Sequence, residues 1–201
     1  MGTRGAVGFK LDQKEVIFYN HYDSYPDALG QDTVNYVRSV KDWDKIREQV
    51  ANFEAIDPGI EPTQAHIDRA YELRTVNLGV SNQSEKDWYC LTREAQGDLG
   101  KQLELGFGTL SNEFVYDSLF CEYAYIINLD TMELEFYEGF NTDRNAEGRY
   151  AKGSYPSEDG SVADEYGGVV LKGEVPLNAI PDDWQERFYP EESDEDEGED
   201  R

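Results

Sequence analysis

The amino-acid sequence predicts an α+β fold, in which an antiparallel sheet of two β-hairpins and a late strand is covered by helices from the middle of the chain. Two observations predict the hairpins: strand-like pairs of alternating hydrophobicity occur at the start of the chain and again past its middle. A third observation predicts the cover, because the segments between the hairpins carry hydrophobic residues at spacings of three and four, as a helix face does.

The first hairpin is expected over residues 5–11 and 15–20, joined by a turn at Asp12-Gln13-Lys14. Hydrophobic residues alternate along both segments: Val7, Phe9, Leu11, Val16 and Phe18. The early glycines Gly2, Gly5 and Gly8 lack the spacing of a dinucleotide-binding fingerprint, and no strand precedes them. They are expected to permit close backbone approach in the first strand.

Helices are expected in the middle of the chain. Asp32 is placed as the N-cap of the first helix, which turns one apolar face inward with Val34, Tyr36, Val37 and Val40. A second helix is expected over 42–53, and Pro58-Gly59 then breaks the chain.

Two further helical segments follow that break. Residues 62–73 predict a third helix, with Ile67, Ala70, Tyr71 and Leu73 directed inward and His66 facing solvent. A fourth is predicted over 87–105, although Gly97 and Gly100 weaken its helical propensity.

The second hairpin gives the clearest strand signal in the chain. Residues 121–129 and 133–137 are aromatic and β-branched, and they flank a short turn at 130–132. One more strand is expected over 169–175. The following segment, 176–184, is expected to cover the core through Leu177, Ile180 and Trp184.

The domain organisation follows from length and composition. The 201 residues suit one domain over 1–190, with the glycine-, serine- and acid-rich stretch 141–168 as a long loop that serves either as a lid or as a disordered segment. Residues 191–201 are predicted to be a disordered acidic tail. That tail has eight acidic residues and one arginine, so it carries −7 of the net charge of −25 and leaves −18 on the rest.

This acidity restricts the classes of partner. A surface of −18 repels nucleic acid and anionic lipid, so direct nucleic-acid binding is not expected without a local cationic pocket, whereas a basic protein would be attracted. No apolar run approaches the roughly 20 residues that span a bilayer, and no signal-peptide pattern opens the chain. The protein is therefore expected to be cytoplasmic, with no membrane partner.

Metal and redox chemistry have little support in the sequence. Cys90 and Cys121, the only cysteines, have no metal-like pairing and are interpreted as reduced, buried, small hydrophobic residues. Acidic pairs such as Asp42 with Asp44 lie outside any calcium-loop or His-x-x-Glu pattern and are interpreted as solvated surface. No metal and no cofactor are predicted.

The densest group of functional side chains lies at the far end of the first hairpin. It comprises Arg4, Asn20, His21, Asp23 and Tyr25. In one interpretation His21 is a general acid or base that Asp23 orients, and Arg4 holds a substrate carboxylate or phosphate. In the other, Arg4 and Asp23 form a structural ion pair and His21 caps the following loop.

The same region carries a resemblance to a known family. The run Gly2-Thr3-Arg4-Gly5 with Gly8-Phe9, then Tyr19-Asn20-His21, Asp23-Ser24-Tyr25-Pro26 and Leu29-Gly30, resembles the opening of an uncharacterised protein family found in phages, bacteria and some fungi. The 121–137 hairpin and the Pro176-Leu177 and Ile180-Pro181 pairs are similar to the same family. The resemblance implies no established activity.

A fainter similarity is to N-terminal-nucleophile hydrolases. These place a nucleophile directly after the initiator methionine, with Asn or Arg and Asp at the end of the second strand, where Asn20 and Asp23 stand here. Gly2 occupies the nucleophile's place and has no side chain to attack with. Thr3 could serve only after removal of both Met1 and Gly2.

Two functional hypotheses result. The first is an acidic interaction protein, of the kind encoded by a phage or mobile element as an accessory protein, that binds a basic host factor. The alternative is a small enzyme or ligand-binding domain with its site at Arg4, Asn20, His21 and Asp23, including a degenerate N-terminal-nucleophile hydrolase fold. The sequence leaves the substrate, the partner and the oligomeric state open.

Overall fold

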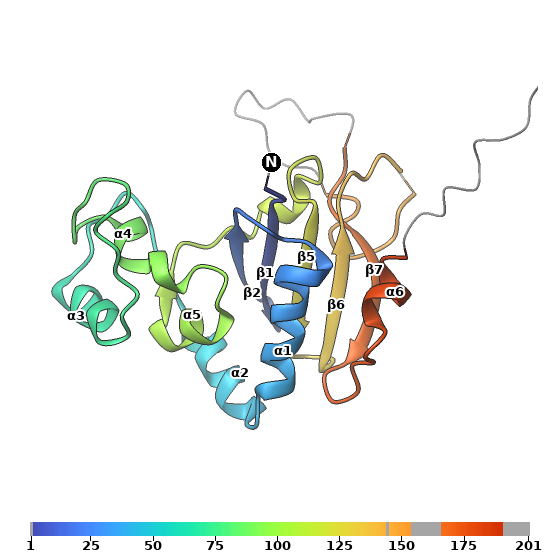
Figure 1. Ribbon diagram of the computed structural model, residues 1–201, viewed down its shortest axis with the longest axis horizontal. Helices are drawn as coiled ribbons and strands as arrows, with labels where there is room; N and C mark the ends of the chain where they lie inside the picture. Colours follow the sequence, from blue (N-terminus) through green and yellow to red (C-terminus); the bar gives the residue numbers. More distant parts are fainter. Residues whose placement is uncertain (1, 144, 154–165, 191–201) are drawn as a thin grey trace, which may run out of the picture.

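The computed structural model describes residues 2–143, 145–153 and 166–190, which form an α+β fold around a five-stranded sheet (Figure 1). The strands are β1 (Gly5–Leu11), β2 (Lys14–Asn20), β5 (Tyr123–Asn128), β6 (Glu133–Glu138) and β7 (Val170–Pro176), in the order β2-β1-β5-β6-β7. A separate two-stranded pair is formed by β3 (Glu54–Ala55) and β4 (Phe107–Gly108). Among the described residues, no helix is long and apolar enough to cross a membrane.

The prediction of an antiparallel sheet is wrong at one position, because β1 and β5 pair in parallel and the sheet is mixed. The hairpins themselves are antiparallel, since a short turn reverses the chain between neighbouring strands. Between β2 and β5, however, the chain forms helices α1 to α5. It then returns to the same end of the sheet at which β2 finished, so that Asn20 and Tyr123 both lie beside Gly5. That long connection lets β5 run beside β1 in the same direction.

The first hairpin is confirmed, with Gly5 opposite Asn20 and Leu11 opposite Lys14. The expected role of the early glycines is also confirmed for Gly5 and Gly8, whereas Gly2 lies outside β1. A Cβ at Gly5 would lie 2.5 Å from the carbonyl oxygen of Tyr123, and a Cβ at Gly8 would lie 2.3 Å from that of Val16. Side chains at these positions would push neighbouring strands apart.

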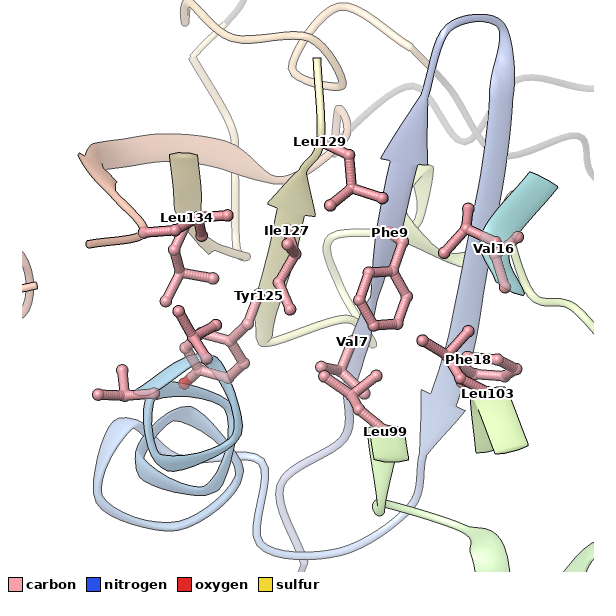
Figure 2. Packing of buried hydrophobic residues seen from close by; sticks show 14 of the residues in the cluster. Val7, Phe9, Val16, Phe18, Leu99, Leu103, Tyr125, Ile127, Leu129 and Leu134 are labelled. Atoms are coloured by element: carbon pink, nitrogen blue, oxygen red, sulfur yellow. The ribbon is translucent and has the colours of Figure 1, made fainter. Parts of the chain in front are cut away.

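One face of the sheet packs against helices. Alternate residues of β1, β2, β5 and β6 point toward α1 (Gln31–Ser39), α2 (Trp43–Asn52), α5 (Leu99–Leu105) and α6 (Trp184–Phe188). Figure 2 shows the inward side chains of this core, among them Val7, Phe9, Val16, Phe18, Tyr125, Ile127 and Leu134. The period of two in the strands and the spacing of three and four in the helices therefore meet at one interface.

The predicted helix starts are partly correct. The helix expected over 42–53 is confirmed as α2, which Asp42 caps by accepting a hydrogen bond from the backbone N–H of Lys45 at 3.0 Å. Asp32 is not an N-cap. The chain is already helical before it, in a π-helical turn at Pro26–Gly30, and α1 begins at Gln31, so Asp32 lies in the first helical turn.

The predicted helix over 87–105 is divided into α4 (Trp88–Thr92) and α5. Gly97 lies between them with a φ of +82°, a conformation that disfavours residues with a Cβ. Together with α3 (Gln64–Glu72), α4 encloses a small core of its own, separate from the main one. In Figure 1 this α3–α4 unit stands beside β2, away from the other strands.

Two orientations predicted for the third helix are wrong. His66 does not face solvent: its ring lies 5.0 Å from that of Trp88 and 4.7 Å from that of Phe107, and its Nε2 lies 3.2 Å from a carboxylate oxygen of Glu54. Tyr71 is not directed inward but is 46% exposed, with its hydroxyl donating to Glu85. The other inward orientations are confirmed, because Ala70 is buried in the small core and Ile67 and Leu73 pack against it.

The remaining elements agree with the sequence. The second hairpin, the late strand and the cover from Leu177 and Trp184 are confirmed, and both cysteines are buried and free. The described part of the 141–168 loop contains neither helix nor strand. Its segment 154–165 and the predicted tail 191–201 lie outside the described residues.

The second face of the sheet is closed by irregular segments and an ionic cluster. Glu135, on β6, is only 3% exposed, and its carboxylate accepts from the guanidinium of Arg149, from Asn128 Nδ2 at 2.7 Å and from the hydroxyl of Tyr137 at 2.8 Å. Arg149 belongs to the segment after β6, so its ion pair with Glu135 stabilises the packing of that segment against the sheet. Nearby, the hydroxyl of Tyr150 donates to Glu15 on β2 at 2.7 Å.

We therefore expect Glu135→Ala to lower the free energy of unfolding by about 3 kcal/mol, because it leaves Arg149 and two neutral donors without their buried acceptor. Urea denaturation of the two proteins measures this. Glu133→Ala is the matched control, on the same strand and face but with no ion pair among the described residues. Equal effects of the two substitutions would contradict the assigned role of the cluster.

Candidate functional site

The sequence-predicted site residues do meet at one end of the sheet. β1, β5 and β7 begin at this end, and β2 and β6 finish there. This end of the sheet is therefore formed by the residues before β1, the loop after β2, the segment before β5 and the turn after β6. The N-terminus marks this end in Figure 1.

Arg4 is held by the segment before β5 rather than by Asp23. Its backbone N–H donates to Glu122 Oε1 at 3.3 Å, and its carbonyl accepts from the Glu122 N–H at 3.0 Å. Its guanidinium carbon lies 5.3 Å from the centre of the Phe120 ring, at cation–π distance. No ion pair joins Arg4 to Asp23 or to any other described carboxylate, so the structural ion pair predicted from sequence is absent.

His21 is bonded to a phenol. The hydroxyl of Tyr19 shares a hydrogen bond with Nδ1 of His21, whose ring meets that of Tyr22 edge-on at 4.3 Å. Burial raises the pKa of Tyr19, while the nearby charge of Arg4 acts to lower it. The predicted orientation of His21 by Asp23 is not found, because the partner of the imidazole is the neutral Tyr19 hydroxyl.

Asn20 and Asp23 shape the loop that carries these side chains. Asn20 Nδ2 donates to the carbonyl of Tyr22 and, at 2.9 Å, to Oγ of the buried Ser24. Asp23 adopts a left-handed φ of +51°, and its carbonyl accepts from the N–H of Leu29 at 3.1 Å. These contacts give Asn20 a positioning role, whereas the exposed carboxylate of Asp23 has no partner among the described side chains.

Tyr25 belongs to a cluster of exposed apolar side chains at this end. Nine large hydrophobic residues are exposed in the described part of the chain, and five of them lie here. We call these five the apolar rim: Tyr22, Tyr25, Leu119, Phe120 and Phe140, each between 40% and 59% exposed. A gathering of exposed apolar side chains at one end of an otherwise polar protein is typical of a binding site.

The charge around the apolar rim is negative. Residues 2–4, 21–29, 117–122 and 138–140, which form this end, contain one arginine, Arg4, and five acidic residues: Asp23, Asp27, Asp117, Glu122 and Glu138. Of these, Glu138 is paired with Lys172 at 2.7 Å. Burial raises the pKa of Asp117, because the carboxylate is partly withdrawn from water.

A cavity of about 650 Å³ lies beside this end, between the β2 edge and the α3–α4 unit. Arg4, Asn20, His21, Asp23 and Tyr25 do not line it. Tyr19 does, so its hydrogen bond to His21 links the two regions. The sequence reasoning overlooked the cavity because its walls come from separate elements. Eight of its lining residues fall within 86–96, which is the part of its wall most concentrated in the sequence.

Comparisons with known proteins add no assignment. No protein-family model, curated protein or solved structure gives a significant match to this chain. Within residues 2–143, 145–153 and 166–190, no group of three or more histidine, cysteine or acidic side chains could hold a metal ion. Thr3, the residue considered as a nucleophile, is 2% exposed, so substrate cannot reach its hydroxyl in this conformation.

The effect of substitution on the free energy of unfolding should distinguish residues that fix the loop after β2 from residues that only face solvent. We expect Asn20→Ala to lower the free energy of unfolding by about 1 kcal/mol, because it removes the bonds that fix the loop at Ser24. Asp23→Asn, which keeps a residue tolerant of the left-handed backbone, should change it by less than about 0.5 kcal/mol. Chemical denaturation measures both, and the reverse order of effects would refute the assigned positioning role of Asn20.

Proposed function

We propose that this protein is an acidic interaction protein that docks a basic segment of a partner protein on the apolar rim. One observation carries the proposal: five of nine exposed large hydrophobic residues gather at one end of the sheet. Large aromatic side chains form the anchors of protein interfaces, since they bury much apolar area for little loss of conformational freedom.

The charge of the surroundings supports a basic partner. The net charge of −25 and the acidic residues around the rim attract lysine- and arginine-rich surfaces and speed their encounter. Aromatic rings in the rim can also contact cationic side chains through their faces. A partner segment with basic residues beside apolar ones matches both features.

The sequence-predicted residues take distinct parts in this proposal. Tyr25 belongs to the rim itself, and His21 supports it through its ring contact with Tyr22. Arg4 lies on the Phe120 ring and so favours the orientation of that anchor. Asn20 holds the loop, and Asp23 offers an exposed carboxylate to a cation on the partner.

A synthetic peptide that alternates arginine with leucine and tryptophan tests the proposal, with the same peptide carrying glutamate for arginine as its counterpart. In two-dimensional NMR of the full chain, we expect the basic peptide to shift resonances of the 20–25, 119–122 and 139–140 segments and the acidic peptide to shift none. Phe120→Ser combined with Phe140→Ser should weaken the binding at least tenfold, because both anchors are lost.

Leu78→Ser is the matched control, since Leu78 is 40% exposed but lies near α4, outside the rim. Its affinity for the peptide should equal that of the unaltered protein. Shifts spread over the whole acidic surface, or equal weakening by Leu78→Ser and the double substitution, would overturn the proposal in favour of unspecific charge attraction.

A further inference from the structure

We infer that the cavity between β2 and the α3–α4 unit is a binding site for a small planar aromatic anion, that is, an aromatic ring bearing one phosphate or carboxylate. The volume of about 650 Å³ lies within the range of small-molecule sites. This site is separate from the apolar rim, so the inference stands or fails independently of the proposed interaction.

Aromatic side chains from both sides of the cavity supply its apolar walls. Phe18 and Tyr19 come from β2, Trp88 and Tyr89 from α4, and Phe107 from β4. Trp88 is fixed in place, because its Nε1 donates to the carbonyl of Ile60 at 2.6 Å. Tyr89, 48% exposed, and the partly buried Tyr19 offer ring surface that a planar ligand can contact.

Arg93 supplies the positive charge. Its guanidinium donates to the side-chain oxygen of Gln96 and lies 5.8 Å from the centre of the Tyr89 ring, but it pairs with no described carboxylate. Several described cations of this acidic chain have no acidic partner, and Arg93 is the one among them that lines the cavity. Guanidinium groups bind carboxylates and phosphates through paired hydrogen bonds, so Arg93 favours an anionic ligand.

The other charged side chains of the cavity are already engaged. Lys86 and Glu61 pair with each other at 2.8 Å. The carboxylate of Asp87 accepts from the Tyr89 backbone at 2.8 Å and from the Ser81 hydroxyl at 2.6 Å, and the hydrogen bond from Ser81 leads the lowering of its pKa. Arg93 is therefore the cation of the cavity that is left for a ligand.

Gln102, on α5, indicates that the ligand carries a hydrogen-bond donor. It contributes to the cavity wall, and its Oε1 is buried with no hydrogen-bond partner. Such an acceptor carries a desolvation penalty until a donor reaches it. Gln102 Oε1 is closed to solvent in this conformation, so a ring N–H or amino group of a ligand meets that need once the Gln102 side chain turns toward the cavity.

Isothermal titration calorimetry of the full chain tests the inference with adenosine monophosphate and indole-3-carboxylate, each beside its neutral counterpart, adenosine and indole. We expect saturable 1:1 binding of at least one anion and binding at least tenfold weaker for its neutral counterpart. The phosphate and carboxylate probes distinguish the two sources of negative charge.

Substitutions then locate the site. Arg93→Gln should weaken binding at least tenfold, whereas Arg74→Gln, which removes the same charge from an exposed position outside the cavity, should leave it unchanged. Gln102→Leu should also weaken binding. It should nevertheless keep or raise the midpoint of urea unfolding, because the orphaned acceptor is gone. A purely structural Gln102 would show the opposite pattern.

Binding should also move the NMR resonances of the His21 ring, because Tyr19 lines the cavity and bonds that imidazole. Absence of saturable binding by both anions at millimolar concentration overturns the inference. Equal affinity for the neutral counterparts, or equal weakening by Arg74→Gln and Arg93→Gln, overturns it as well.

Discussion

The parallel pairing of β1 with β5 is the constraint on which the rest of the structure depends. It joins the first hairpin to the second across the centre of the sheet, with Gly5 opposite Tyr123 and Phe9 opposite Ile127. Because both strands start at the same end, residues more than a hundred positions apart meet there. Every contact of Arg4 with Phe120 and Glu122 follows from this register.

The same pairing determines how the two faces of the sheet are closed. The chain between β2 and β5 must leave and return at one end, and its helices cover one face during that excursion. In the described part of the chain, the opposite face is covered by the short 3-10 helix Phe114–Tyr116 and by the segment around Tyr150 rather than by α-helices. There the ion pair of Glu135 with Arg149 joins the segment after β6 to the sheet through a charge-assisted hydrogen bond.

The apolar rim and the cavity occupy neighbouring positions because β2 is an edge strand. Its last residues lead into the loop that bears Tyr22 and Tyr25, and its free side borders the α3–α4 unit. Tyr19 stands between them, lining the cavity and bonding His21. Arg4 at the apolar rim and Arg93 at the cavity have no carboxylate partner among the described residues. Each guanidinium lies beside an aromatic ring instead.

The sequence by itself determined the local elements and the grouping of candidate residues. Alternation in Val7, Phe9 and Leu11 and the short turns predict both hairpins, because hydrogen bonding between adjacent segments needs only local information. The helix expected over 42–53 and the chain break at Pro58 are local in the same sense. Tertiary structure alone decided the parallel partner of β1, the packing of His66 against Trp88 and Phe107, the exposure of Tyr71, and the partners of Arg4 and His21. Each depends on packing between segments distant in sequence, where the free energy of long-range contacts outweighs local propensity.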